Sequence, residues 1–359
     1  MTGPLDGIRV LELAGIGPGP HAAMILADLG AEVVRVSRPG QPPTSDEAVL
    51  RGRRHVVADL RDVQDRDAVL DLVERADVLV EGFRPGVTER LGLGPEACLE
   101  RNPRLVYARM TGWGQTGPLS KTAGHDINYL SITGLLHAIG TADRPIPPLN
   151  VVGDYGGGSM FLVLGVTAAL LQRERTGRGD VVDAAMVDGV SVLSQLILDL
   201  RAEPSWGWTN RRESNLIDGG APFYRTYRCA DGRFIAVGAM ERQFFEMLAE
   251  GVGLNPEEFP DHMDASCWPV LEQRLTALIA EHSRDHWQQT FEGTDACVTP
   301  VLTFDEAAQH PHVVARRSLS MVDGRLQAGP APRFSMPAEP ARSADVSDLV
   351  ACLERWTPR

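Results

Sequence analysis

The 359-residue sequence is poor in three features: paired cysteines, basic charge and long apolar runs. Its five cysteines include no C-x-x-C pair, which excludes a disulfide-rich secreted scaffold and predicts reduced thiols. The formal net charge of -13 excludes a general nucleic-acid surface, because phosphates require a basic face. The longest apolar run, residues 160–171, is shorter than the roughly 20 residues that span a bilayer. Since the N-terminus also lacks a basic segment leading into an apolar core, we expect a cytoplasmic protein that binds neither nucleic acid nor a membrane.

The remaining composition is that of an ordinary globular chain, with 43% hydrophobic and 23% charged residues. Because single cores stop growing below about 300 residues, the length predicts two domains. Apolar runs of strand length lie at residues 8–13, 33–36, 78–80, 105–110 and 181–186. Segments with helical spacing lie between them, at residues 21–29, 66–75 and 159–174. Strands separated by helices imply parallel pairing, so we expect a doubly wound, Rossmann-like α/β large domain.

The pattern changes after residue 190. Residues 193–225 show no clear periodicity and predict a long connection. An Asp231-Gly232 pair between two strand-like runs then indicates a hairpin, and helical spacing follows it, which is typical of a smaller α+β domain. The predicted divisions are a large domain over 1–190, a linker over 191–224, a small α+β domain over 225–310, and a return linker with a C-terminal helix completing the large domain over 311–359.

Residues 15–20, Gly-Ile-Gly-Pro-Gly-Pro, follow the first predicted strand, where a dinucleotide-binding fold has its phosphate loop. The glycine spacing matches only the loose form of that motif. Pro18 and Pro20 remove backbone donors, and Arg38 stands where an acid is expected about 20 residues on. A tight turn that brings the helix onto the sheet is the simpler interpretation, and a nicotinamide cofactor is the alternative.

Arginines gather near the predicted strand ends of this acidic chain. They are Arg38, Arg51, Arg53, Arg54, Arg61, Arg84 and Arg90. Strand ends of a doubly wound sheet converge on one crevice, so guanidinium groups there suit the phosphates of a carrier such as coenzyme A. The alternative to phosphate binding, for any single arginine, is that it lies in solvent and binds nothing.

Segments spread over nearly the whole chain match one known family in order. They are residues 4–15 (PLDGIRVLELAG), 27–35 (ADLGAEVVR), 124–129 (GHDINY), 182–186 (VDAAM), 229–232 (CADG), 295–301 (DACVTPV) and 310–312 (HPH). Together they resemble the family III (CaiB/BaiF-type) CoA transferases, a family that includes the α-methylacyl-CoA racemases, and specifically its racemase branch. Ser37 departs from the acid that is usual in the family. The resemblance implies an interlocked homodimer in which long connections join the two lobes of each chain.

The resemblance also implies catalytic roles for three residues. Transferases of the family use the aspartate matching Asp154 as a nucleophile and generally lack a histidine at the position of His125, whereas the racemases keep one. His125 and Asp154 are therefore expected to transfer protons, with Glu241 pairing with His125. An acyl-CoA substrate is implied, without metal or cofactor. The implied CoA contacts are Arg38, Ala58, Asp59, Leu60, Arg61, Gly82, Phe83, Arg84, Arg90, Gly124, Asp126, Ile127, Asn128 and Tyr129.

Inversion of the carbon next to a thioester requires removal of a proton from one face and its return on the other. A histidine, with an ordinary pKa near ~6.5, exchanges protons at neutral pH. Asp154 must be protonated for part of the cycle, and here the sequence leaves two effects opposed, since a helix start favours the ionised form and burial the protonated form. Free N–H groups of residues 155–158 are expected to receive the enolate oxygen.

Each assignment has an alternative without catalysis. Asp154 suits a helix N-cap, Glu241 the first turn of a helix, and His125 a loop. His310 and His312 have no further ligand at metal spacing and predict a turn. The predicted function is a racemase/epimerase of 2-methylacyl-CoA thioesters; a CoA transferase, a nicotinamide oxidoreductase and a CoA-binding protein without catalysis are the alternatives.

Overall fold

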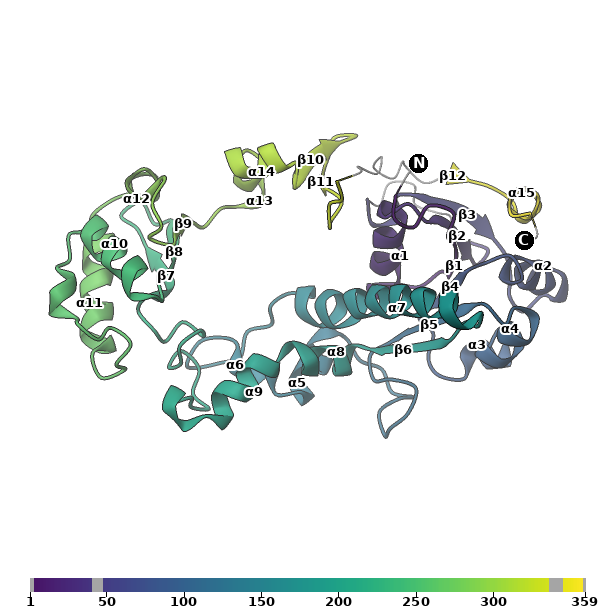
Figure 1. Cartoon of the computed structure of the whole chain (residues 1–359), viewed down its shortest axis with the longest axis horizontal. Coiled ribbons are helices and arrows are strands. Elements are labelled where there is room, and N and C mark those ends of the chain that lie inside the picture. Colours follow the sequence, from purple (N-terminus) through teal and green to yellow (C-terminus); the bar gives the residue numbers. More distant parts are fainter. Residues whose placement is uncertain (1–2, 41–47, 336–344, 358–359) are drawn as a thin grey trace. The chain divides into compact units, whose positions relative to one another are not determined.

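The structure is a computed structural model, and it describes residues 3–40, 48–335 and 345–357 (Figure 1). The chain divides into two compact units. The first unit comprises Met1–Leu135, Pro148–Gln195 and Arg317–Arg359, and the second comprises Leu136–Pro147 and Leu196–Arg316. The domain boundaries expected from the sequence are not tested by this division into two units and stay a prediction.

Within the described residues, a seven-stranded parallel sheet forms the centre of the first unit, in the order β12-β3-β2-β1-β4-β5-β6. The strands are β1 (Arg9–Leu13), β2 (Glu32–Ser37), β3 (Arg53–Val57), β4 (Val78–Glu81), β5 (Val106–Thr111), β6 (Val181–Ala185) and β12 (Asp345–Val346). This is the strand order of a Rossmann-like sheet with one strand added at an edge, which confirms the expected α/β class. Sequence patterning missed β3, because its sequence, RRHVV, starts with three polar residues.

Helices cover both faces of this sheet. Those of the first unit are α1 (Pro18–Asp28), η1 (Ala48–Leu50), α2 (Val63–Val73), α3 (Val87–Arg90), α4 (Pro95–Arg101), α5 (Asp126–Ile132), η2 (Val151–Ser159), α7 (Met160–Thr176), α8 (Met186–Leu193) and α15 (Leu349–Arg355). On one face, α1 and α7 pack on Val10 and Val80. On the other face, α2, α4 and α15 pack on Leu11 and Leu79. Neighbouring residues of one strand enter opposite cores, which explains why these strands are apolar at nearly every position.

The strand order reverses between β1 and β4. The chain runs outward from β1 to β3 and then returns to place β4 on the other side of β1. In open parallel sheets, ligands bind outside the carboxyl ends of the strands at such a reversal. The topology therefore places the expected site beside the ends of β1 and β4.

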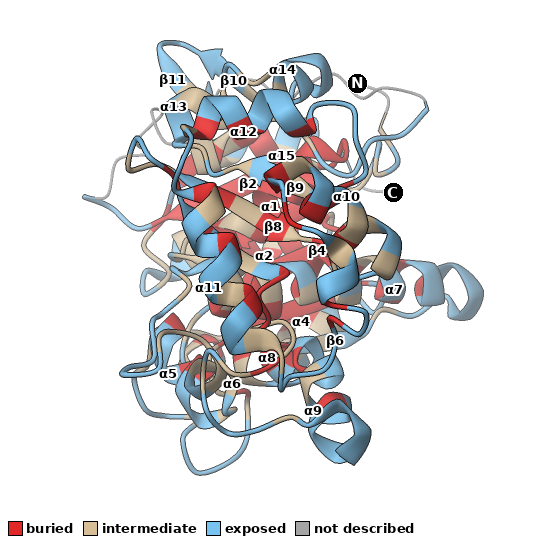
Figure 2. Ribbon diagram, turned by 90° about the vertical axis from the view of Figure 1, so that its left-hand side faces the viewer, coloured by how far each residue is buried: buried red, intermediate tan, exposed pale blue. Residues whose placement is uncertain are grey.

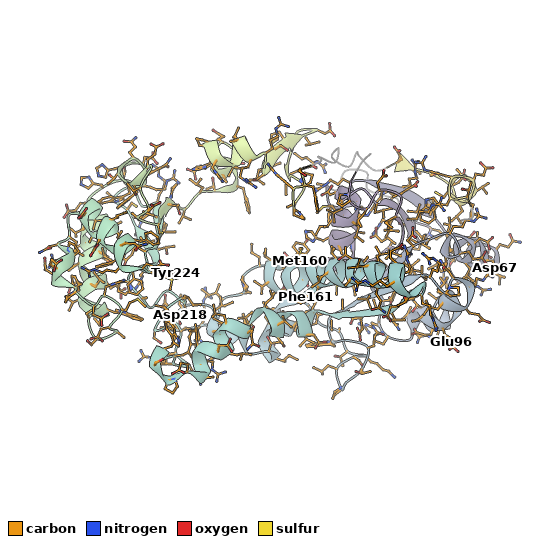
Figure 3. The ribbon with its side chains drawn as sticks, viewed as in Figure 1. Asp67, Glu96, Met160, Phe161, Asp218 and Tyr224 are labelled. Carbon is orange, nitrogen blue, oxygen red and sulfur yellow. The ribbon has the colours of Figure 1, made fainter. Side chains whose placement is uncertain are left out.

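Asp154 lies in a π-helical segment, η2, which runs directly into α7. Figure 3 marks Met160 and Phe161, where α7 begins. Asn150 occupies the N-cap of η2, so the alternative of Asp154 as an N-cap is wrong. Sequence analysis missed η2 because three consecutive glycines have low helix propensity. π-helical turns frequently occur at functional sites.

In the described part of the chain, Val151–Thr176 is the one helical stretch long and apolar enough to cross a membrane. Length and composition alone give this result, and a core helix of a soluble protein gives it too. α7 contributes Leu162 and Val166 to the core on the sheet. Of the most apolar part of the stretch, 44% is buried inside the fold.

A close contact between two glycines joins η2 to α8. A Cβ on Gly189 would lie 1.9 Å from the carbonyl oxygen of Gly157, and backbone cannot move aside as a flexible side chain does. We expect Gly189→Ala to lower the free energy of unfolding by about 1–3 kcal/mol, through overpacking. Chemical denaturation measures this change. Gly19→Ala in α1 is the matched control, because a Cβ there meets nothing within 4 Å, and equal destabilisation of both variants would contradict the assignment.

The second unit contains an antiparallel sheet with the strand order β7-β8-β9. Its main elements are β7 (Tyr224–Arg228), β8 (Phe234–Gly238), β9 (Val298–Pro300), α10 (Arg242–Val252), α11 (Trp268–Ile279) and α12 (Arg284–Phe291). The hairpin expected around Asp231-Gly232 is confirmed, with Gly232 at a φ of 78°. Buried residues follow one side of α11, at Leu271, Leu275 and Ile279 (Figure 2). The segment 193–225, expected as a long connection, contains the helix α9 (Gln195–Ala202), which the sequence pattern did not indicate.

Candidate active site

A cavity of about 350 Å³ lies at the carboxyl ends of β1, β4 and β5 in the first unit. Its wall consists of the ends of these strands, the turn over residues 15–20, the loop after β4, the loop before α5, and Asp154 of η2. The expected site residues that line it are Gly82, Phe83, Arg84, Gly124, His125, Tyr129 and Asp154. The structure thus brings both expected proton-transfer groups to one cavity, at the topological reversal of the sheet.

His125 is held at the N-cap of α5 by its own backbone. Its N–H donates to Asn128 Oδ1 at 3.0 Å, and its carbonyl accepts from the Asn128 N–H at 2.8 Å. The imidazole is exposed toward the cavity that it lines. These two bonds fix the backbone of His125 at the start of α5.

Tyr129 packs against the loop that leads to His125. Its hydroxyl donates to the Gly124 carbonyl at 2.5 Å, and its ring meets Trp113 edge to face at 4.7 Å between centroids. A Cβ on Gly112 would lie 2.1 Å from the Tyr129 ring, so only glycine fits there. Aromatic packing and one hydrogen bond thus fix the loop that carries His125.

Asp154 is positioned by Asp126, the residue next to His125. The Asp154 N–H donates to Asp126 Oδ2 at 2.7 Å, and Asn150 Nδ2 lies 3.4 Å from Asp154 Oδ2. Gly153 lies so close to Asp126 that a Cβ would be 2.4 Å from Oδ2. The buried carboxylate of Asp126, in the first turn of α5, therefore fixes the position of Asp154 relative to α5, the helix that begins at His125.

The pKa of the Asp154 carboxyl is raised, chiefly by burial. The Asp126 charge raises this pKa further, whereas the Asn150 hydrogen bond and His125 lower it. Burial thus prevails over the opposing effects that the sequence left undecided. A carboxyl with a raised pKa is better suited to hold and return a proton near neutral pH.

The amide groups after Asp154 differ from the expectation. The Tyr155 N–H donates to the Asn150 carbonyl at 3.4 Å, so it is not a free donor for an enolate oxygen. The expectation was wrong for this residue because it placed Asp154 before the helix, whereas Tyr155 lies within η2.

Asp126→Asn is expected to lower the pKa of Asp154, because the substitution removes the negative charge that raises it and keeps the oxygen that binds the Asp154 N–H. When Asp154 acts as base, the rate rises as pH increases through this pKa; when it acts as acid, the rate falls. Both inflections should therefore move to lower pH, as pH profiles of kcat in the two directions would measure. Asp71→Asn, in an exposed ion pair with Arg101, is the control. An unchanged profile for Asp126→Asn would contradict the assignment.

Glu241 belongs to the second unit, at the N-cap of α10, where its side chain makes no capping hydrogen bond with the described residues. Its neighbourhood in that unit includes Cys297, whose pKa is raised by burial and then by the Glu241 charge. The pairing of Glu241 with His125 stays a prediction.

The other expected CoA contacts lie mainly at strand ends of the same sheet edge. Arg38 follows β2 and residues 58–61 follow β3, so both stand at the carboxyl edge of the sheet, but they are not among the residues that line the cavity. Arg61 is exposed and bonds Asp59 in a local pair. Arg90 ends α3, with its guanidinium next to Gly86. In α5, Ile127 and Asn128 are exposed, whereas Asp126 is buried.

Two of the clustered arginines have internal partners. Arg51 bonds both oxygens of Asp28, at 3.0 and 2.5 Å, and Arg53 is 2% exposed and bonds Glu12. The expectation that these two hold phosphates is therefore wrong, because their donors are already engaged. Arg84 lines the cavity, and its contact with CoA stays a prediction.

Sequence reasoning missed two carboxylates at the cavity, Glu12 and Glu81. Glu81 ends β4, where its Oε2 accepts the Phe83 N–H at 2.7 Å and its Oε1 accepts Arg109 Nε at 2.9 Å. Burial raises the pKa of Glu81. The available signal was an acidic residue at the end of an otherwise apolar strand, where burial requires a partner.

Among residues 3–40, 48–335 and 345–357, no group of three His, Cys, Asp or Glu side chains is arranged to hold a metal ion. The five cysteines are free thiols.

The chain belongs to CoA-transferase family III, whose model matches residues 5–347. It is 47% identical over 347 residues to a Mus musculus protein named alpha-methylacyl-CoA racemase, covering 96% of this chain and 90% of the mouse protein. It is 32% identical over 352 residues to an Acetobacter aceti protein named acetyl-CoA:oxalate CoA-transferase, covering 91% and 88% of the two chains. A solved structure of a CaiB/BaiF family protein from Brucella suis matches with a TM-score of 0.82 at 26% identity, covering 99% of this chain and 100% of that one.

Proposed function

We propose that the protein is an isomerase that interconverts the (2R) and (2S) forms of 2-methylacyl-CoA thioesters. The observation that carries the proposal is one cavity lined by both His125 and Asp154, the latter with a raised pKa. Similarity to the mouse racemase supports it, since that similarity is higher than to the transferase. His125 stands at the position where the racemases of the family keep a histidine.

In the proposed reaction, one group removes the proton from the carbon next to the thioester, and the other returns a proton on the opposite face. The base gains the proton that the carbon loses, so the total charge in the cavity is unchanged when the enolate forms. Leu13, Met110 and Met186 give the cavity apolar walls suited to an acyl chain. Reduced access of water favours the protonated Asp154 that the return step requires.

The CoA portion is proposed to lie across the sheet edge formed by the ends of β2, β3 and β4. Arg38, Arg84 and Arg90 would meet its phosphates, as forked guanidinium groups do in other phosphate sites. We further propose that the enzyme is a cytoplasmic, interlocked homodimer that needs no metal or cofactor and binds neither nucleic acid nor a membrane.

A CoA transferase is the second candidate, because a relative with that name matches most of the chain. The test is incubation of one pure 2-methylacyl-CoA enantiomer in heavy water, with NMR detection of inversion and of deuterium at carbon 2. Inversion with deuterium uptake is expected. No inversion, together with a covalent acyl or CoA adduct on Asp154 in the presence of a free carboxylic acid, would replace the racemase by the transferase.

A further inference from the structure

A cluster of buried charges lies beneath the turn that joins β1 to α1. Glu12, Arg35 and Arg53 are 1%, 8% and 2% exposed. Glu12 and Arg35 are register partners on neighbouring strands, and Arg35 is the partner of His55, two residues after Arg53. Side chains at these positions therefore point to the same face of the sheet, the face that α1 covers.

One carboxylate orients both guanidinium groups. Glu12 Oε2 accepts from Arg53 Nε at 2.6 Å, and Glu12 Oε1 accepts from Arg35. Each arginine then reaches one end of the turn over residues 15–20. Arg35 Nη2 donates to the Gly15 carbonyl at 3.1 Å, and Arg53 Nη2 donates to the Pro20 carbonyl.

Residues 18–20 of this segment are the first turn of α1, and residues 15–17 lead into it. Pro18 and Pro20 have no N–H to donate, and Gly17 has a φ of 68°, in the region that favours glycine. The two guanidinium groups instead hold this segment by its carbonyls, those of Gly15 and Pro20. The cost of burying two cations with one anion is considerable, and apolar residues of similar volume often give equal or greater stability.

The turn also touches the helix that carries Asp154. A Cβ on Gly17 would lie 3.7 Å from Asp154 Oδ2, and a Cβ on Gly158 would lie 3.2 Å from Pro18. All six turn residues line the cavity. A shift of the turn would therefore move the wall against which the Asp154 carboxyl stands.

We propose that Glu12, Arg35 and Arg53 form a positioning network that holds the turn over residues 15–20 against Asp154. The consequence for catalysis rests on the proposed function: the network supports kcat and leaves CoA binding nearly unaffected, since its hydrogen bonds join Glu12, Gly15 and Pro20 and, among the described residues, none goes to a proposed CoA contact.

The test uses two variants of the full chain. Arg35→Lys keeps a cation beside Glu12 and lacks the second arm that reaches Gly15, and Glu12→Gln removes the shared anion. Both should lower kcat by about tenfold to a hundredfold, the scale of a misplaced reacting group, with KM changed less than about threefold. Hydrogen exchange measured by mass spectrometry should become faster in residues 13–21. Asp28→Asn is the control: Asp28 ends α1 and pairs with Arg51, which lies between η1 and β3, and this variant should leave kcat and the exchange unchanged.

Folded Arg35→Lys with wild-type kcat and wild-type exchange in residues 13–21 would overturn the proposal. Loss of kcat in Glu12→Gln alone would also overturn it, because Glu12 would then act on the substrate directly. A wild-type protein that does not invert its substrate would refute the proposed function instead, and faster exchange in Arg35→Lys would still support the network.

Discussion

Asp154→Asn is expected to lower kcat for inversion by about a thousandfold, the middle of the range for loss of a general acid–base group. The substitution keeps the size of the side chain and the backbone N–H that donates to Asp126 Oδ2. It removes the only proton-exchanging function of this side chain, because an amide does not titrate near neutral pH. Steady-state polarimetry of 2-methylacyl-CoA measures the loss.

A second variant, Asn150→Ala, distinguishes loss of the Asp154 carboxyl from misfolding around it. Asn150→Ala removes the hydrogen bond at Asp154 Oδ2 but leaves the carboxyl in place. This variant should lose far less activity than Asp154→Asn, and CoA binding measured by calorimetry should be similar in both. Retention of more than about a tenth of wild-type kcat in Asp154→Asn would exclude the residue as an acid–base group.

His125→Ala is expected to lower kcat by about a hundredfold to a thousandfold. The backbone bonds with Asn128 do not use the imidazole, so the N-terminus of α5 should persist. Imidazole added to the assay should restore part of the lost activity by entering the space left in the cavity. His286→Ala, an exposed histidine of α12, is the control. Full activity of His125→Ala, or loss that imidazole cannot relieve together with loss of the α5 fold, would contradict the assignment.

The fold was largely predictable because its strands carry the signal that patterning detects. Runs such as residues 8–13 and 78–80 are apolar at nearly every position, as a sheet covered on both faces requires. β3 escaped because Arg53 and His55 point into a polar cluster instead of an apolar core. η2 escaped because its glycines serve close helix contacts, and packing of this kind overrides local propensity.

The site was predictable only where the chemistry resides in single residues. The family resemblance selected His125 and Asp154, and the structure places both at one cavity. The roles of Asp126 and Glu12 depend on bonds to residues 28 and 41 positions away in sequence, to Asp154 and Arg53, and no local pattern encodes such pairings. For the same reason, arginines that look alike in sequence divide into internal and cavity-lining groups.

The central claim is that His125 and Asp154 each serve one face of the same carbon. Single-turnover exchange in heavy water, with each enantiomer given separately to His125→Ala and to Asp154→Asn, tests it most directly. Each variant should lose α-proton exchange with one enantiomer and retain it with the other, and the two variants should differ in which one they lose. If both variants lose exchange with the same enantiomer, His125 and Asp154 act on the same face of the carbon and the account is contradicted.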